Sequence, residues 1–470
     1  MIRRELVILG AGPAGMAAAI TAGRCGIRAT VIDENATSGG QIFRQPPKSF
    51  VTSDSPADDE NAARGTDLRK ELASLGDRIE LLPATTVWGY FPQRQIAIRN
   101  EQGWQMIEAK QLILAPGAYE FVPPFPGWTL PGVMTPGAAQ SMVKTMKILP
   151  GKRVLVAGSG PFLLVVAAQL HAAGVEVVGV VEAVRRRDIL RHFPDLLSNR
   201  KLLGQGRRYY RTLQQAGIPF HWGHLVTEAH GNESVEQATI TACDSQSRPQ
   251  GRSTTISLDT LCVGYGFVPR IELAQMADCH VQYSDLLGSW IPEVDENFET
   301  SVPGVRVAGD GGGVAGAIAA ELQGTLAALA ALHQLGQLDA SAFEQQRTPI
   351  VFRLNKLQKF RRALDQIYRI RSGLLDLALP DTIVCRCEEL TRQEVETGIQ
   401  FGGTDIPTLK VSTRLGMGPC QGKMCWSMAA RMIAAQTGKS IADIGPVRVR
   451  PPVGPLEIAD LLNPQLLETS

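Results

Sequence analysis

Short apolar runs, a glycine turn and a helical stretch alternate at the start of the chain. Residues 5–9 (ELVIL) are followed by GAGPAG, by an alanine-rich stretch at 16–26 and by a second apolar run within 27–35 (IRATVIDEN). Apolar runs of this length next to glycine favour strands, and the alanine-rich stretch is long enough for a helix. The pattern therefore predicts a strand, a turn, a helix and a second strand, which together form a βαβ unit.

The same order of patterns returns after Lys152, with RVLVA, GSGPFL, LVVAAQLHAAG and VEVVGVVEA. Landmark residues of the two copies are 148 positions apart: Gly10 and Gly158, Gly12 and Gly160, Pro13 and Pro161, Gly26 and Gly174, Glu34 and Glu182. One glycine fingerprint alone is weak evidence, but a repeat that preserves turn, helix length and final acid predicts two dinucleotide-binding domains. We therefore expect an α/β protein with two Rossmann-like domains.

The first glycine turn has the chemistry of a pyrophosphate site. Gly10 permits a tight turn, Gly12 lets the backbone approach the phosphates, and Gly15 lets the helix pack closely on the strand. An acid at the end of the second strand can accept hydrogen bonds from an adenosine ribose, which disfavours a 2′-phosphate. A glycine turn without a ligand is the alternative. The nucleotide-binding residues predicted for this unit are Gly10, Gly12, Pro13, Ala14, Gly15, and Glu34 or its neighbour Asp33.

Three further segments resemble the flavoproteins with two dinucleotide-binding domains, of which thioredoxin reductase is a familiar member. These are SGGQ at 38–41, LILAPGA at 112–118, where Pro116 replaces the usual Thr, and TSVPGVRVAGD at 300–310. The resemblance covers residues 1 to about 335 and implies FAD as the first nucleotide, with the second domain inserted into a discontinuous FAD domain. The additional FAD-binding residues that we predict are Gly39, Gly40, Gln41, Val87, Ala115, Gly117, Gly309 and Asp310.

Asp310 also has a physical rationale, since it ends an apolar run and precedes the helical pattern AIAAELQGTLAALAAL. A carboxylate and free backbone N–H groups meet at such a helix start. In the family that the segment resembles, this Asp holds a hydroxyl of the flavin ribitol. A plain helix N-cap is the alternative role.

The second fingerprint is degenerate. Gly158 and Gly160 are present, but Leu163 occupies the place of the third small residue and should push the helix away from the strand. Glu182 suits the ribose of NAD, whereas the arginines at 185–187 suit the 2′-phosphate of NADP. We take Gly158, Gly160 and Glu182 as the candidate site for NAD, for another adenine nucleotide such as ATP, or for no ligand. We also expect NAD(P)H to be an inefficient reductant.

Four cysteines form two close pairs near the C-terminus: Cys385 and Cys387 in CRC, and Cys420 and Cys425 in CQGKMC. Four thiolates can bind zinc or an iron–sulfur cluster. Structural zinc usually prefers CxxC, so the CxC pair favours a 2Fe-2S site. The glycines of RLGMGPCQGKMC can fold the backbone around the sulfurs and present N–H groups to them.

The segment from VCRCEEL to CQGKMC resembles the ferredoxin domain of the bacterioferritin-associated ferredoxin type. This resemblance implies a 2Fe-2S cluster bound by Cys385, Cys387, Cys420 and Cys425. The other cysteines, at 25, 243, 262 and 279, are expected to be core residues. The chain contains no CxxC, so it lacks the redox motif of the disulfide reductases.

Composition shifts mark the expected domain boundaries. A proline-rich connection at 116–132 ends the first segment, and a basic helical pattern begins near Thr348. We expect an FAD-binding domain at 1–131 and 271–345, an NAD(P)-binding-like domain at 132–270, a basic linker helix at 346–378 and a small α-rich 2Fe-2S domain at 379–470. A length of 470 residues agrees with several domains.

The charge balance excludes some functions. The 47 Lys and Arg residues match 46 Asp and Glu residues, so no global field attracts nucleic acid. No apolar run reaches the length of about 18 residues that a membrane helix needs. The N-terminus has no pattern of a secretory signal, and the protein is expected to be cytoplasmic.

The whole arrangement resembles the α (A) subunit of heteromeric amine-oxidising flavoenzymes, which include opine oxidases, D-hydroxyproline dehydrogenases, hydrogen cyanide synthase and sarcosine oxidase. The resemblance implies that a D-amino acid oxidase-like partner oxidises the CH–NH bond of a secondary amine or amino acid of the opine, D-hydroxyproline or glycine class. This chain then relays electrons through FAD and 2Fe-2S. An FMN at the subunit contact and a small 2Fe-2S subunit occur in some members.

Two other functions stay open at this point. The chain could be a self-contained NAD(P)H:acceptor oxidoreductase, or its cysteine-rich tail could be a docking module for another redox protein. The basic stretch from Arg353 to Arg371, with seven cationic residues and Asp365, suits either a partner clamp or a solvated helix face. No catalytic acid, base or nucleophile can be picked out.

Overall fold

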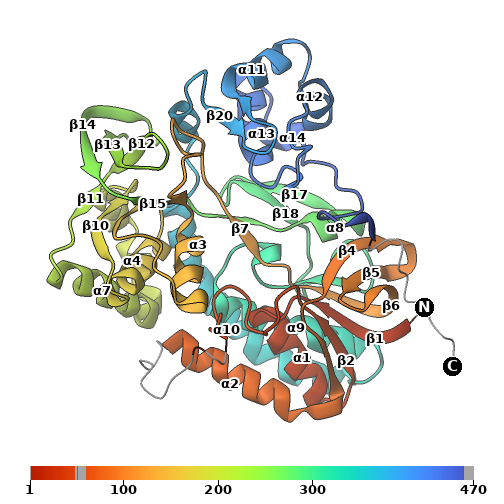
Figure 1. Cartoon of the computed structure of the whole chain (residues 1–470). Helices are drawn as coiled ribbons and strands as arrows, with labels where there is room; N and C mark the ends of the chain where they lie inside the picture. Colours follow the sequence, from red (N-terminus) through yellow and green to blue (C-terminus); the bar gives the residue numbers. More distant parts are fainter. Residues whose placement is uncertain (1, 48–49, 51–59, 460–470) are drawn as a thin grey trace.

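The first βαβ unit forms as the hydrophobic pattern predicts. In the computed structural model, which describes residues 2–47, 50 and 60–459, β1 (Ile2–Leu9) and β2 (Ala29–Ile32) are parallel, and α1 (Pro13–Arg24) connects them. Most of α1 is buried because its Ala and Gly residues pack closely between the sheet and neighbouring helices (Figure 1).

β1 and β2 belong to a seven-stranded sheet with the order β3-β2-β1-β6-β5-β4, and β19 pairs with β6. The centre is parallel, while β4, β5 and the first half of β6 form an antiparallel meander. Because β19 lies far along the chain, this sheet combines an N-terminal segment with a late one. Its other strands are β3 (Ile79–Leu82), β4 (Thr86–Phe91), β5 (Gln95–Asn100), β6 (Gly103–Leu114) and β19 (Val305–Val307).

Helices pack together below this sheet in the view of Figure 1, namely α1, α2 (Glu60–Ser74), α9 (Ala317–Gln334) and α10 (Ala340–Ile367). The contact between α1 and α9 is close: a Cβ added at Gly324 would lie 2.0 Å from the carbonyl oxygen of Ala14. Only a glycine at this position lets α9 lie against the start of α1.

The second βαβ unit also forms, with β9 (Arg153–Gly158), α4 (Phe162–Ala172) and β10 (Glu176–Glu182). They belong to a parallel sheet with the order β11-β10-β9-β15-β8. Helix α4 covers one face together with α7, and an antiparallel sheet packs on the other face. The additional elements are β8 (Val133–Met134), β11 (Phe220–Trp222), β15 (Thr260–Gly264), α7 (Arg200–Gln215), β12 (His224–His230), β13 (Gln237–Cys243) and β14 (Pro249–Ser257).

The basic linker helix differs from the expectation. Helix α10 begins at Ala340, after the N-cap Asp339, and ends at Ile367, so it starts earlier and ends earlier than the predicted helix up to Arg371. It continues through Pro349, although a proline removes one helical hydrogen bond. Phe343 and Ile350 pack on leucines of α9 on either side of the proline, and this packing keeps the helix continuous.

The C-terminal region is mainly helical, as expected, and lies at the top of Figure 1. A capping box between Thr391 and Glu394 starts α11, and the core of the region is built around α13. Its elements are β20 (Ile383–Cys385), β21 (Leu390–Thr391), α11 (Arg392–Gln400), α12 (Ile406–Thr413), α13 (Trp426–Thr437) and α14 (Ile441–Ile444). Within the described parts of the chain, no helix is both long and apolar enough to cross a membrane.

Hydrogen bonds fasten the C-terminal region to the rest of the protein. The indole N–H of Trp128 donates to the carbonyl oxygen of Ile383 (2.7 Å), at the start of this region. Near its end, the backbone N–H of Val453 donates to the carbonyl oxygen of Trp88 on β4 (2.8 Å). The chain after α14 therefore returns to the first sheet.

Candidate functional site

The turn between β1 and α1 can be built only from glycines. Gly10 has φ +102°, and a Cβ there would lie 2.3 Å from the carbonyl oxygen of Ala115. A Cβ at Gly15 would lie 1.7 Å from the carbonyl oxygen of Gly10. Such distances are impossible for a real side chain, so both residues are needed to place the N-terminus of α1 against the end of β6. A helix N-terminus in this position can receive a pyrophosphate.

The predicted SGGQ segment lies against this turn. The backbone N–H of Gly39 donates to the carbonyl oxygen of Ala11 (2.8 Å). A Cβ at Gly40 would lie 2.8 Å from the Cα atom of Gly12, so two glycines face each other. The next residue, Gln41, is exposed.

Arg69 of α2 holds the SGGQ loop from behind. Its guanidinium donates to the carbonyl oxygens of Ser38 (3.3 Å) and Phe43 (3.0 Å), one on each side of the two glycines. Local sequence gives no signal for this contact, because Arg69 lies in a different element from the loop that it supports.

The late GD motif joins the same place. A Cβ at Gly309 would lie 3.0 Å from the methyl group of Ala14, next to the first turn of α1. The carboxylate of Asp310 accepts hydrogen bonds from the backbone N–H groups of Ala315 (3.0 Å) and Gly316 (3.3 Å), just before α9 begins. Both bonds end on the same oxygen of Asp310, which shapes the start of α9, and its other oxygen points away from these two donors.

The LAPGA turn closes the cradle that these segments form. The backbone N–H of Ala115 donates to the carbonyl oxygen of Leu9 (2.8 Å), and the carbonyl oxygen of Gly117 accepts from the backbone N–H of Arg270 (3.0 Å). Four segments far apart in the sequence thus meet at the N-terminus of α1. We call this arrangement the glycine cradle; it comprises residues 10–15, 38–41, 115–117 and 309–310.

The two acids after β2 have different environments. The carboxylate of Asp33 is buried and accepts from the backbone N–H groups of Ala11 (2.5 Å) and Asn35 (2.7 Å). The side chain of Glu34 is half exposed and pairs with the guanidinium of Arg270 at 3.1 Å. Asp33 therefore stabilises the glycine turn, and Glu34 faces outward.

The strand registers show which acid corresponds to Glu182. On β1 and β2, Leu9 pairs with Ile32, whereas on β9 and β10 Gly158 pairs with Glu182. The position after Ile32 is Asp33, so Asp33 and not Glu34 matches Glu182. A register shift in β10 around Val178 supplies the extra residue. The constant spacing of 148 positions thus fails at the acid.

Val87, the last predicted FAD contact, lies on β4 and is partly buried against the core of the first sheet. The nearby backbone N–H of Thr85 donates to the carbonyl oxygen of Asp33 (2.9 Å). The strand that carries Val87 therefore starts beside the acidic end of the cradle.

A buried polar network next to the cradle has no sequence signal. The guanidinium of Arg270 donates to the hydroxyl of Tyr119 (3.0 Å), and this hydroxyl donates to the carboxylate of Glu272 (2.9 Å). Burial raises the pKa of the Tyr119 hydroxyl far above its usual value. Together with the ion pair to Glu34, the network links the cradle to α8 (Glu272–Met276).

The second fingerprint folds correctly but is closed. A Cβ at Gly158 would lie 1.7 Å from the carbonyl oxygen of Gly264, so the turn needs this glycine. The buried carboxylate of Glu182 accepts from the backbone N–H groups of Gly160 (3.0 Å) and Val184 (2.9 Å). Burial raises the pKa of Glu182 to about 7, against the opposing effect of these N–H donors.

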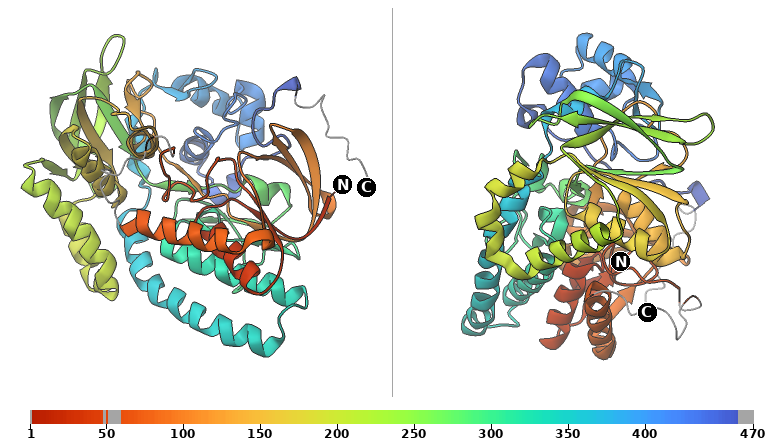
Figure 2. Two further views of the ribbon diagram at one scale, coloured as in Figure 1. Left: turned by 60° about the horizontal axis from the view of Figure 1, so that its bottom comes forward. Right: turned by 90° about the vertical axis from the view of Figure 1, so that its left-hand side faces the viewer.

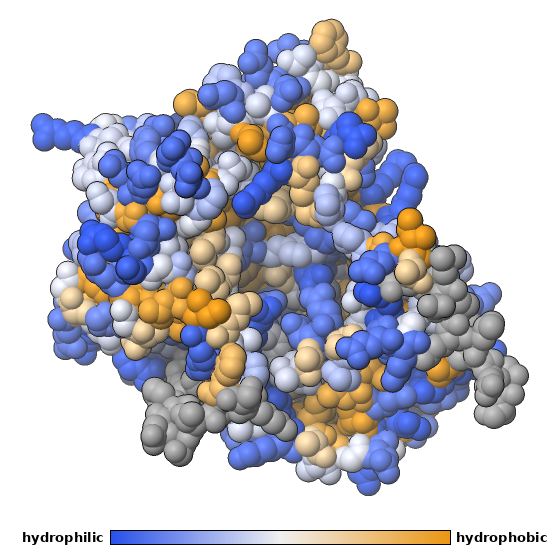
Figure 3. All heavy atoms as spheres, viewed as in Figure 1, coloured by the Kyte–Doolittle hydropathy of each residue, from blue (hydrophilic) through white to orange (hydrophobic). Residues whose placement is uncertain are grey.

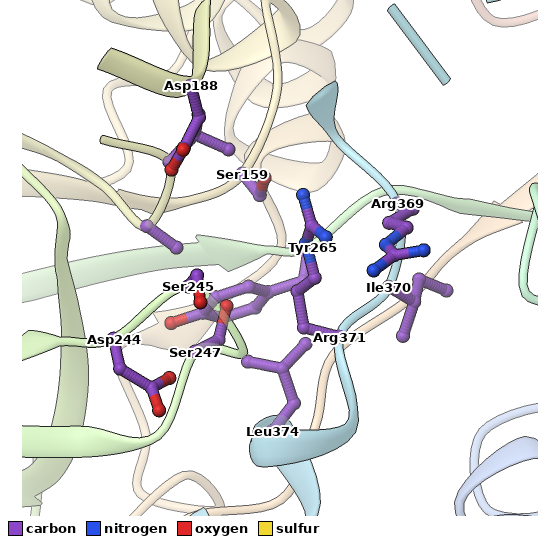
Figure 4. Close-up of a pocket in the computed structure, with 12 residues that line it drawn as sticks. Ser159, Asp188, Asp244, Ser245, Ser247, Tyr265, Arg369, Ile370, Arg371 and Leu374 are labelled. Atoms are coloured by element: carbon purple, nitrogen blue, oxygen red, sulfur yellow. The ribbon is translucent and has the colours of Figure 1, made fainter. Parts of the chain in front are cut away.

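A small polar pocket beside this fingerprint is covered by the chain itself (Figure 4). Ser159 lies on one side, and Arg369, Arg371 and Leu374 of the segment after α10 lie on the other. The remaining cavity of about 10 Å³ has room for roughly one water molecule. A dinucleotide enters only if the segment after α10 moves away.

The arginines near this pocket are also partly engaged. Arg185 pairs with Asp188 at 2.8 Å, and Arg186 lies over the ring of Trp222. Leu163 is buried in the core beneath α4. These contacts leave the second fingerprint without a free arginine cluster for a 2′-phosphate.

From this closed pocket we expect NADH and NADPH to be poor reductants of the purified chain. Even at about 1 mM, near the upper end of common KM values, either should reduce bound flavin far more slowly than dithionite does. Stopped-flow absorbance of the flavin measures this directly. Complete reduction within a second by micromolar NADH would contradict the prediction and would favour an NAD(P)H:acceptor oxidoreductase.

The four C-terminal cysteines come together from two segments. Cys385 ends β20 and Cys425 directly precedes α13; both are buried, and their thiols are hydrogen-bonded to each other. Cys387 is exposed and hydrogen-bonded to Cys420. Each pair therefore joins one thiol of CRC with one thiol of CQGKMC.

Backbone groups surround the first pair as the glycine-rich sequence predicts. Backbone N–H groups of Gly416, Cys387 and Glu388 donate to the sulfur of Cys385. The hydrogen bond from Cys425, together with these donors, lowers the pKa of Cys385 to about 6. A Cβ at Gly418 would lie 2.2 Å from the Cβ atom of Cys387, so the loop can pass only as glycine.

Within the described residues, no group of three or more His, Cys, Asp or Glu side chains is arranged around one metal position. The thiols stand instead as two pairs. In a binuclear cluster each metal takes two protein thiolates, whereas structural zinc gathers four ligands around one ion.

The comparisons with known proteins agree with this architecture. Residues 4–324 match the family described as pyridine nucleotide-disulphide oxidoreductase, and residues 380–463 match the sarcosine oxidase A3 domain. The fold and the glycine cradle thus define a flavoprotein oxidoreductase, and membership in this family implies FAD.

Relatives narrow the assignment. The chain is 36% identical over 454 residues to hydrogen cyanide synthase subunit HcnB of Pseudomonas protegens, covering 96% of each chain. It is 35% identical to the α (A) subunit of opine oxidase from Rhizobium meliloti, covering 97% of this chain and 87% of that one. The chain therefore belongs to the family of α (A) subunits of heteromeric oxidases, as the sequence resemblance indicated.

A solved structure supports the fold over nearly the whole length. L-proline dehydrogenase from P. horikoshii superposes with a TM-score of 0.69 at 20% identity, covering 98% of this chain and 79% of that one. The expected fold class is confirmed, with two Rossmann-like regions and a helical C-terminal region.

Proposed function

We propose that this chain is the electron-transfer subunit of a heteromeric dehydrogenase or oxidase that acts on a secondary amine or amino acid. The observation that carries the proposal is the presence in one chain of a glycine cradle suited to FAD and of two thiol pairs suited to 2Fe-2S. The relatives named as subunits of opine oxidase and of hydrogen cyanide synthase support the substrate class of opines, D-hydroxyproline or glycine.

The residues of the cradle fit FAD by shape and charge. Gly10, Gly12 and Gly15 leave room for a pyrophosphate at the N-terminus of α1, where N–H groups favour an anion. The second carboxylate oxygen of Asp310 can accept a hydrogen bond from a ribitol hydroxyl. At the adenosine end, Asp33 fixes the turn and Glu34 can reach a ribose.

The donor set at the C-terminal region fits a 2Fe-2S cluster held by Cys385, Cys387, Cys420 and Cys425. Buried Cys385 and Cys425 place one side of the cluster inside the protein, and exposed Cys387 places the other at the surface. When bound, FAD takes up electrons in pairs and 2Fe-2S passes them singly. The backbone N–H groups around Cys385 stabilise a thiolate there.

The amine is oxidised on this proposal by a D-amino acid oxidase-like flavoprotein partner. An FMN at the subunit contact and a small 2Fe-2S subunit are further proposed components. The closed second pocket supports this function over an NAD(P)H-dependent one, because it removes the usual entry of reducing equivalents. An adenine nucleotide in that pocket, NAD or ATP, requires the segment after α10 to move.

Co-expression tests the proposal. The chain and a D-amino acid oxidase-like subunit from the same organism are expected to co-purify and to reduce a dye with opines, hydroxyproline or glycine. The isolated chain should show no such activity. An isolated chain that oxidises an amine unaided, or a pair that never associates, would refute the proposed role within a complex.

A further inference from the structure

A large groove lies between the two Rossmann-like regions. It is lined by α9 and α10 on one side and by α5 (Arg186–Arg191), α6 (Phe193–Leu196) and α7 on the other, with a cavity volume of about 1800 Å³. Figure 2 (left) shows α7 on one side and α2 and α10 on the other. We call it the interdomain groove.

The interdomain groove is mostly apolar and its side chains are accessible. Exposed fractions are 67% for Leu190, 43% for Phe193, 43% for Leu197 and 41% for Ile318. The face drawn in Figure 3 is by contrast largely hydrophilic, with separate apolar patches. Apolar side chains gathered from several helices in this way mark an interaction site.

The size of the groove indicates a macromolecular occupant. Small-molecule sites usually measure about 300–1,000 Å³. The interdomain groove exceeds this range, and it is open along the helices that line it. A protein segment with apolar side chains fills such a space, whereas a single cofactor does not.

The charges of the groove specify the kind of segment. Seven Lys and Arg residues line it, against three Asp and Glu residues. Two of the acids are already paired with arginines of the groove, Glu321 with Arg64 and Glu296 with Arg347.

Cationic side chains remain for a partner. Lys201, Arg207 and Arg353 are exposed and make no hydrogen bond or ion pair within the described part of the chain. A partner surface with Asp or Glu beside its apolar side chains complements this rim.

The groove also reaches the flavin side of the molecule. Its lining includes residues 315–319 at the start of α9, whose N–H groups at 315 and 316 bind Asp310. A partner in the groove therefore lies next to one end of the glycine cradle, where electrons would enter.

We propose that the interdomain groove is the docking site of the amine-oxidising partner subunit, which inserts a segment with apolar and acidic side chains. This inference rests on the proposed function and adds the surface through which the two subunits meet. It gives α10 a role in binding through its groove-facing residues, and not through its whole basic face.

Charge reversal with a matched control tests the site. The double variant Lys201→Glu/Arg353→Glu changes the rim of the groove, and Lys356→Glu/Arg362→Glu makes the same change at exposed positions of α10 outside it. The groove variant should bind the separately purified D-amino acid oxidase-like subunit at least about tenfold more weakly. The control should bind within about twofold of the unmodified chain.

A second variant addresses the apolar part. Leu190→Ser removes an exposed leucine and should weaken binding by about tenfold without lowering the melting temperature or flavin content. Biolayer interferometry on intact chains gives the dissociation constants. Equal binding by the groove variants and the control overturns the docking site alone, whereas failure of the unmodified chain to bind overturns the proposed function as well.

Discussion

Replacing Cys385 or Cys420 by serine should abolish the visible absorption of the iron–sulfur cluster while FAD stays bound. Each cysteine belongs to a different thiol pair, so either change removes one of the two thiolates on one iron. The cradle lies in another region and keeps its glycines. Absorption and EPR spectra of the purified variants, with iron and sulfide analysis, measure the result.

A control for thiol loss is Cys25→Ser, because Cys25 is partly exposed near the end of α1 and far in sequence from the thiol pairs. This variant should keep the full cluster spectrum. Zinc without iron in the unmodified protein, or a cluster retained in both Cys385→Ser and Cys420→Ser, would show that the assignment of the metal site is wrong.

Gly15→Ala should yield a chain without FAD and with a much lower stability. Its Cβ would lie 1.7 Å from the carbonyl oxygen of Gly10, which forces α1 away from the end of β1 and opens the cradle. Backbone displacement of this kind costs about 3 kcal/mol or more. The ratio of flavin to protein after purification, together with thermal unfolding, measures both effects.

Gly206→Ala is the matched control. Gly206 lies on α7, and a Cβ there meets no atom within 4 Å. Because alanine favours helix over glycine, this variant should be more stable by about 0.5–1 kcal/mol and should bind FAD normally. A Gly15→Ala protein that retains a full complement of FAD would refute the role of the cradle.

The local patterns of the sequence predicted the parts of the fold that depend on local interactions. Both βαβ units, the buried β19 and helix α9 follow from short apolar runs, glycine turns and helical periodicity. The cradle was also predictable, since each of its segments has its own motif. The convergence of these segments needed the resemblance, because no local pattern shows that residues 10, 39, 115 and 309 meet.

Features that depend on tertiary contacts escaped prediction. One extra residue in β10 changes which acid matches Glu182, and a constant sequence spacing cannot reveal a bulge. Arg270 acts on Glu34 from 236 positions away, without any motif. The start of α10 was missed because packing on α9 outweighs the cost of Pro349. The closure of the second pocket by Arg371 and Leu374 is equally non-local.

The contacts of the C-terminal region determine how its thiols can exchange electrons with the cradle. Trp128 holds the start of the region, and the chain around Val453 is bonded both to β4 and to the amine of Lys423 in the cysteine loop (2.9 Å). A region fastened at both ends does not swing between a loading and a delivering position. Electron exchange within the chain is therefore governed by a fixed separation through protein, unlike that of a carrier domain on a flexible tether.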